Sequence, residues 1–164
     1  MLEGFKLAGA IVAFVTASFT VWDRWARGRP LAWVTAKKLG VNPYKYIRIK
    51  NPGPADVFIL AVRVYPPKLY AVSKDHSGEA IVGAASFNLD VNAVLWQGEN
   101  RDLPIIEVSK PDQRATAADQ PVRFVIYWRK TSSSWLRQVP VVIWTSTHDI
   151  ERMANAATAD FKQA

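Results

Sequence analysis

The chain has 164 residues, seven tryptophans, no cysteine and a net charge of +7. This length is enough for one domain and an anchor. The lack of cysteine excludes a disulfide scaffold, a thiolate zinc site and a cysteine nucleophile. Hydrophobic residues make up 49% of the sequence, which is ample for a core.

The N-terminal region contains an apolar run, Leu7 to Trp22, which is 16 residues long and has no charge. As a helix it would be about 24 Å long, and with Lys6 reaching toward the headgroups it extends to about 20 residues. This length predicts a single transmembrane helix. The residues expected at the membrane interface are Lys6, Trp22, Arg24, Trp25, Arg27 and Arg29.

Other interpretations of this segment stay open. Val15-Thr16-Ala17 resembles the small-residue site of a cleaved signal peptide. A buried core helix is also compatible with so short a run. Small residues at Gly9, Ala13 and Ala17 recur every four positions, which favours close packing against another helix.

The positive charge lies directly after this run. Residues 23–50 hold eight cations and one acid, while the rest of the chain has 13 of each. Such a cluster beside an apolar helix is typical of contact with anionic headgroups. The positive-inside rule then places the following domain in the cytoplasm of a single-pass membrane protein.

From residue 31 onward the pattern changes to short alternating segments separated by turns. Strands are predicted at residues 31–36, 46–50, 56–65, 85–96, 103–108, 122–130 and 135–145. The last two are joined by a loop at Thr131–Ser134, and Pro104 and Pro140 are expected at edges or bulges. This spacing predicts an antiparallel β-sandwich of immunoglobulin-like or related topology.

The sequence then returns to helical spacing. Ser146-Thr147-His148-Asp149 resembles a capping box, and Ile150, Met153, Ala154, Ala157 and Phe161 form one apolar stripe. The predicted organisation is a transmembrane anchor with a basic segment (1–30), a β-sandwich (31–146) and a short C-terminal helix (147–164).

No motif in the sequence indicates catalysis, a metal site or a cofactor. The two histidines, His76 and His148, lie in different segments and lack partners at a zinc spacing. Asp75-His76-Ser77 are sequence neighbours, which cannot readily adopt the geometry of a catalytic triad. We therefore expect no enzyme activity, no catalytic residues, no metal and no cofactor.

Two basic and aromatic stretches could contact nucleic acid or anionic lipid, and lipid is favoured because the charge lies beside the anchor. Their residues are Tyr44, Lys45, Tyr46, Arg48 and Lys50, and Arg123, Tyr127, Trp128, Arg129 and Lys130.

The function that the sequence favours is a non-enzymatic, membrane-anchored interaction or assembly module. Its expected partners are an anionic lipid bilayer and a protein partner or a second copy of the chain. A secreted or periplasmic binding domain with a cleaved signal is one alternative. A membrane-tethered nucleic-acid-binding domain is the other.

Overall fold

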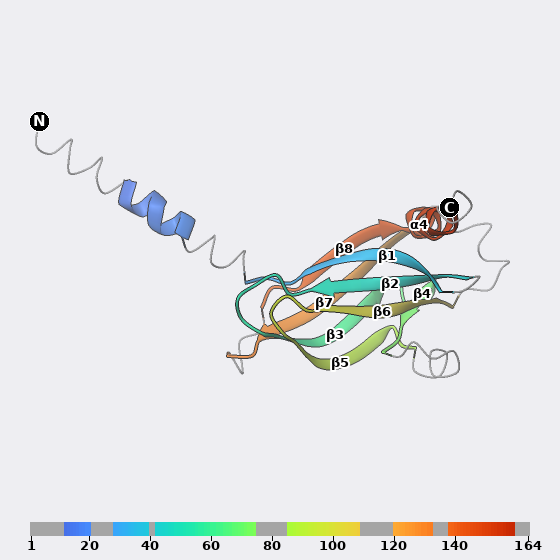
Figure 1. Ribbon diagram of the computed structural model, residues 1–164, viewed down its shortest axis with the longest axis horizontal. Helices are drawn as coiled ribbons and strands as arrows, with labels where there is room; N and C mark the ends of the chain where they lie inside the picture. The colour runs from blue at the N-terminus through green and yellow to red at the C-terminus, as the bar shows by residue number, and fades with distance from the viewer. Residues whose placement is uncertain are drawn as a thin grey trace, which may run out of the picture.

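The computed structural model describes residues 12–20, 28–39, 42–74, 85–108, 120–132 and 138–159. Its strands form two antiparallel sheets of four strands each (Figure 1). Sheet A has the order β1-β2-β6-β4, with β1 Leu31–Leu39, β2 Asn42–Lys50, β6 Asn100–Glu107 and β4 Tyr70–Val72. Sheet B has the order β5-β3-β7-β8, with β5 Asn88–Leu95, β3 Val57–Tyr65, β7 Pro121–Lys130 and β8 Val141–Ser146.

Alternation of side chains along each strand builds the core between the sheets. In β7 the even-numbered residues from Val122 to Trp128 are buried, while Arg123, Tyr127 and Arg129 are only partly buried. In β2, Ile47 and Ile49 are fully buried in the same cluster. The prediction of a mainly β chain with two antiparallel sheets is therefore confirmed.

The strand ends differ from those predicted where proline or short length hides the pattern. β8 begins at Val141 rather than at residue 135, directly after Pro140, which has no N–H to donate to a ladder. β4 was not predicted, because its three residues are too few to show alternation. Part of the predicted loop at Thr131–Ser134 lies outside the described residues.

Pro104 does not lie on an edge strand, which corrects the sequence prediction. It is part of β6, which pairs with β2 on one side and β4 on the other. The β4–β6 register ends at Val72 and Ile105, and the Ser73 N–H donates to the Pro104 carbonyl at 3.0 Å. The proline nitrogen therefore faces the place where β4 ends, so no ladder bond is lost there.

A break in register lies at the middle of sheet B. The pairing of β3 with both β5 and β7 shifts between Ile59 and Ala61, at Leu60. On β5, Asn92 has a positive φ of 47°, a conformation that asparagine tolerates better than most residues. This β-bulge changes the spacing of side chains on the outer face of the sheet.

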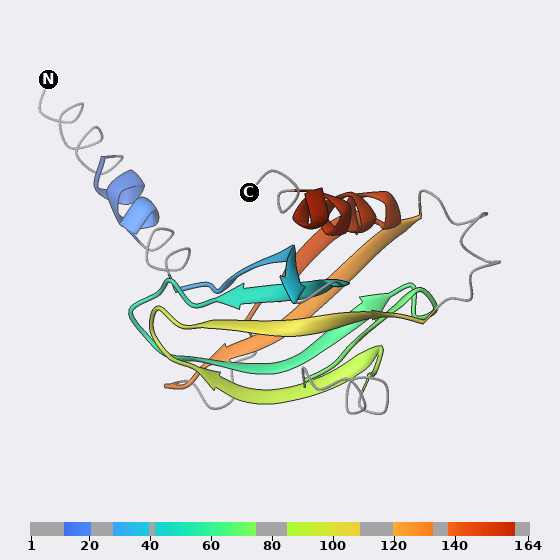
Figure 2. The ribbon, with the colours of Figure 1, turned by 45° about the vertical axis from the view of Figure 1, so that its right-hand side comes forward.

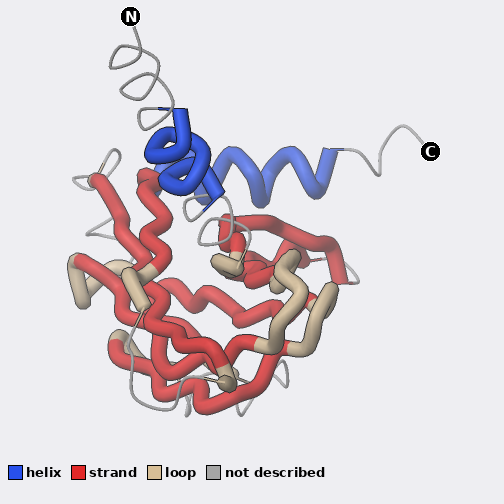
Figure 3. Tube along the Cα trace, turned by 90° about the vertical axis from the view of Figure 1, so that its left-hand side faces the viewer, coloured by secondary structure: helices blue, strands red, loops and turns tan. Residues whose placement is uncertain are grey.

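The C-terminal helix α4, Thr147–Ala159, covers one side of the sandwich (Figures 2 and 3). It contacts β1, β2 and β8 and places Ile150 and Ala154 in the core. The Ser146 hydroxyl accepts a hydrogen bond from the Asp149 N–H at 3.1 Å, as the capping sequence predicts. The apolar stripe therefore packs on the sandwich; Phe161 lies outside the described residues.

No helix in the described part of the chain is long and apolar enough to cross a membrane, so the structure does not support the predicted transmembrane helix. Within the predicted run, residues 12–20 are described and are helical. The other residues of that run lie outside the described ranges.

Candidate functional site

Three of the nine residues predicted at the membrane interface or at helix contacts fall within the described part of the chain. Ala13 and Ala17 are exposed and lie one helical turn apart on the same side of helix 12–20. Arg29 is half-buried, and its Nη2 donates to the Pro140 carbonyl at 2.9 Å. The residues outside the described ranges are Lys6, Gly9, Trp22, Arg24, Trp25 and Arg27.

Helix 12–20 presents apolar side chains on all sides. Phe14 is 74% exposed, Phe19 is 69% exposed, and every residue of the segment is classed as exposed. The hydroxyls of Thr16 and Thr20 each donate to the carbonyl four residues earlier, at 2.8 Å. These bonds satisfy the hydroxyl donors within the helix, which suits apolar surroundings.

On the outer face of sheet A, a group that we call the aspartate cluster consists of Lys37, Tyr46, Arg48 and Asp102. Arg48 donates through Nε and Nη2 to both carboxylate oxygens of Asp102, each at 2.7 Å. Lys37 Nζ donates to Oδ2 of the same carboxylate at 2.7 Å. One acid from β6 therefore pairs two cations from β1 and β2.

The charges and burial of this cluster shift its pKa values. The hydrogen bonds from Arg48 are the main reason that the pKa of Asp102 falls from 3.8 to about 2, and Lys37 adds to the effect. The same bond raises the pKa of Arg48. Burial, and then the negative charge of Asp102, raise the pKa of Tyr46. Ion pairing accounts for the shifts of Asp102 and Arg48, and burial is the main cause of the shift of Tyr46.

Lys45 is paired as well, on the opposite side of β2. Its Nζ lies 3.7 Å from the Glu107 carboxylate and also contacts the Glu151 carboxylate on α4. It stands over the Tyr70 ring at 5.8 Å from the centroid. These contacts join sheet A to α4. Lys45 and Arg48, both predicted as candidates for lipid or nucleic-acid contact, are therefore engaged by acids of the chain itself.

The outer face of sheet B has a different character, and four rows of side chains cross it. The cross-strand partners in these rows are Val94-Phe58-Arg129, Asp90-Ala61-Tyr127, Asn88-Arg63-Val125-Val142 and Tyr65-Arg123-Trp144. Three arginines and four aromatic residues alternate among them. We call the set of Phe58, Arg63, Tyr65, Arg123, Tyr127, Arg129 and Trp144 the arginine face.

Each guanidinium of the arginine face lies over an aromatic ring. The Arg129 group is 4.7 Å from the Phe58 centroid, and the Arg63 group is 5.0 Å from that of Tyr127. Arg123 contacts two rings, at 4.8 Å from Tyr65 and 5.2 Å from Trp144. These are cation–π distances, and each such contact favours the observed position of its guanidinium by about 0.5–1 kcal/mol at an exposed site.

No carboxylate among the described residues lies within ion-pair distance of Arg63, Arg123 or Arg129. Their planar groups can therefore donate N–H bonds to an external anion.

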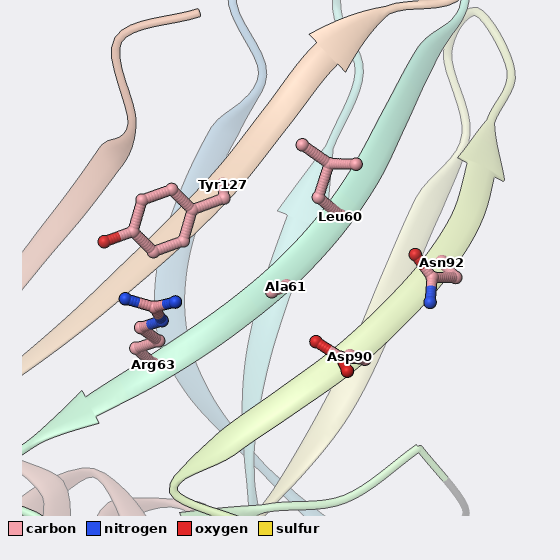
Figure 4. Close-up of a pocket in the computed structure, with 6 residues that line it drawn as sticks. All are labelled: Leu60, Ala61, Arg63, Asp90, Asn92 and Tyr127. Atoms are coloured by element: carbon pink, nitrogen blue, oxygen red, sulfur yellow. The ribbon is translucent and has the colours of Figure 1, made fainter. Parts of the chain in front are cut away.

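A depression of about 490 Å³ lies at the bulge, beside Arg63. It is lined by Leu60, Ala61, Arg63, Asp90, Asn92 and Tyr127. Figure 4 shows Arg63 and Tyr127 on one side of Ala61, with Asp90 and Asn92 on the other. The small Ala61 side chain, between Asp90 and Tyr127 in its row, leaves the space open.

The arginine face was predicted only in part. Arg123, Tyr127 and Arg129 were candidates for binding, and all three belong to it. Trp128, named with them, is instead a core residue with 3% exposure, and its indole N–H donates to the Val139 carbonyl at 3.0 Å.

The residues that β3 contributes to the face, Phe58, Arg63 and Tyr65, were not singled out. Arg63 is the one cation within the apolar run of that strand, which is the signal that could have identified it.

The described residues contain no group of three or more histidines, aspartates or glutamates placed to share a metal ion. No protein-family model matches the sequence, and no curated protein matches it either. The arginine face and the exposed apolar helix are therefore the features on which a functional hypothesis rests.

Proposed function

We propose that the chain is a non-enzymatic, membrane-anchored interaction module. A helix of residues 5–22 anchors it, and the sandwich carries a binding face into the cytoplasm. The observation that carries this proposal is that all nine residues of helix 12–20 are exposed. Exposure of large apolar side chains such as Phe14 and Phe19 to water is unfavourable, and their transfer into lipid is favourable.

We also propose that the topology of the sandwich is related to that of the immunoglobulin fold. Strands β1-β2-β6 and β3-β7-β8 occupy the positions of strands A-B-E and C-F-G in that topology. The edge strands β4 and β5 occupy the positions of D and C′, but they follow each other in the opposite chain order. The strand order thus fits a topology related to the immunoglobulin fold better than the standard immunoglobulin topology.

Alkaline carbonate extraction of membranes from cells expressing the full chain tests the anchor. We expect the chain to stay in the pellet and to need detergent for release. Phe14→Arg places a charge in the helix and should move a large fraction to the supernatant, whereas the matched Phe14→Leu should not. Recovery of the unmodified chain in the carbonate supernatant would contradict the anchor.

Protease protection and N-terminal sequencing test the orientation and the processing. Protease added outside intact spheroplasts should leave the sandwich uncut, and lysis should expose it. Digestion from outside would place the domain on the other side of the membrane. A mature N-terminus near Ser18 would instead identify an exported domain with a cleaved signal.

A further inference from the structure

We propose that the arginine face binds an acidic segment of a protein partner. This inference rests on the proposed role as an interaction module and names the class of partner. The described side chains on the outer face of sheet B include three guanidinium groups but only one carboxylate, that of Asp90. A partner that supplies carboxylates completes this charge pattern.

The fixed position of the arginines favours directional binding of carboxylates. Stacking on Phe58, Tyr127, Tyr65 and Trp144 holds the guanidinium planes and leaves N–H groups available at their edges. A guanidinium pairs with a carboxylate through two parallel hydrogen bonds. Because each guanidinium is already in contact with a ring, binding requires less loss of rotamer freedom than with arginines that lack such a contact.

The neighbours of the arginines favour a protein segment over nucleic acid or a bilayer. Phe58 and Tyr127 are only partly exposed and already carry a guanidinium, which hinders the base stacking that single-stranded nucleic acid uses. Along β5, the carboxylate of Asp90 would repel both a phosphate chain and a flat anionic lipid surface.

On the other flank, Val142 is 37% exposed and Trp144 is 69% exposed. They suit the apolar side chains of a protein. The depression at the bulge adds a place for one large partner side chain. Ala61 and Leu60 line it, and Arg63 and Asp90 stand on opposite sides of Ala61 (Figure 4). A segment with carboxylates and at least one apolar residue therefore matches the whole face.

Fluorescence anisotropy with the full chain in neutral detergent micelles tests this proposal. The probe is a labelled twelve-residue peptide with four glutamates and two leucines in a glycine–serine background. We expect it to bind and the peptide with glutamines in place of the glutamates to bind about tenfold more weakly, because several charge-assisted contacts are lost.

The variant that removes the face is Arg63→Gln, Arg123→Gln and Arg129→Gln combined. Its matched control, Lys50→Gln, Lys68→Gln and Lys74→Gln combined, makes the same charge change at exposed cations elsewhere. The first should weaken binding about tenfold, from three contacts of modest size, and the second by less than about twofold. Equal weakening by both would show that net charge alone binds the peptide and would overturn the proposal.

Two further measurements keep the result independent of folding. Asp90→Asn removes the one repulsive carboxylate and should strengthen binding about twofold, which misfolding cannot imitate. Displacement of the peptide by a twenty-residue oligo-dT, or by phosphatidylglycerol added to the micelles, would assign the face to nucleic acid or lipid instead. Carbonate extraction should be unaffected by these substitutions, so a failure of the anchor and a failure of the face give different results.

Discussion

The outer faces of the two sheets use the same residue types in opposite ways. On sheet A, Arg48 and Lys37 share the carboxylate of Asp102. On sheet B, arginines stack on aromatic rings, and no carboxylate among the described residues pairs with them. The first arrangement is satisfied within the chain, whereas the second leaves donors for an external partner. Charge counted along the sequence does not distinguish the two.

Because of this difference, the binding surface is expected on the arginine face and not on the basic stretch of residues 23–50. The sequence places its excess charge at residues 23–50, but acids from β6 and α4 pair with Lys37, Lys45 and Arg48 of that stretch. The arginine face lies on β3, β7 and β8, in a part of the sequence with balanced charge. A surface can therefore be basic where the sequence is neutral, because Asp90 is the one carboxylate among the described side chains of this face.

The largest expected effect comes from Asp102→Asn. The substitution leaves Arg48, with a 24% exposed side chain, without its carboxylate. We expect the free energy of unfolding to fall by about 2–4 kcal/mol, measured by urea denaturation. Asp90→Asn, the same change on the outer face of sheet B, should alter it by less than about 0.5 kcal/mol. Similar losses for the two variants would remove the distinction between the faces.

The ion pair of Asp102 should also make the stability of the fold depend on pH in the acid range. Asp102 has a pKa of about 2 in the folded chain, below its ordinary 3.8, so the folded state binds this proton more weakly than the unfolded state. Its stabilising effect is complete above pH 3.8 and is lost as the pH falls through about 2. Urea midpoints measured from pH 5 to pH 2 should fall less steeply for Asp102→Asn than for the unmodified chain. Parallel curves would contradict this assignment.

A smaller effect is expected from the arginine face itself. Arg123→Ala removes contacts with two rings and should lower the free energy of unfolding by about 1 kcal/mol. Arg129→Ala removes one ring contact and should have about half that effect. Thermal unfolding followed by circular dichroism measures both. A larger loss for Arg129→Ala would show that the number of ring contacts does not set the order.

The sequence was sufficient for features that repeat locally. The alternating pattern predicted a strand at residues 122–130, which matches β7, and a capping sequence predicted the start of α4 at Ser146. Both signals depend on residues a few positions apart. The sandwich follows from many such strands with no helix between them.

Features that depend on distant pairing were not predictable in the same way. Asp102 meets Arg48 across 54 positions of sequence, and nothing local marks either as a partner. The bulge at Leu60 appears only when β3 is paired with both neighbours. Trp128 was a candidate for binding because it stands beside Arg129 and Lys130, but the period of the strand places its side chain in the core.

The smallest expected effect is that of Lys37→Gln, which tests the order of partners within the aspartate cluster. The Lys37 side chain is 48% exposed, so the loss in the free energy of unfolding should be about 0.5 kcal/mol or less. The pKa of Asp102, followed by NMR of its carboxyl carbon, should rise but stay below 3.8, because the Arg48 hydrogen bonds are its main cause. Lys50→Gln, at an exposed position of β2, is the matched control and should leave both quantities unchanged. A return of the Asp102 pKa to its ordinary value in Lys37→Gln would make Lys37, and not Arg48, the dominant partner of Asp102.

The outer face of sheet A would then be stabilised by an exposed ion pair that salt can screen, and its contrast with the outer face of sheet B would weaken.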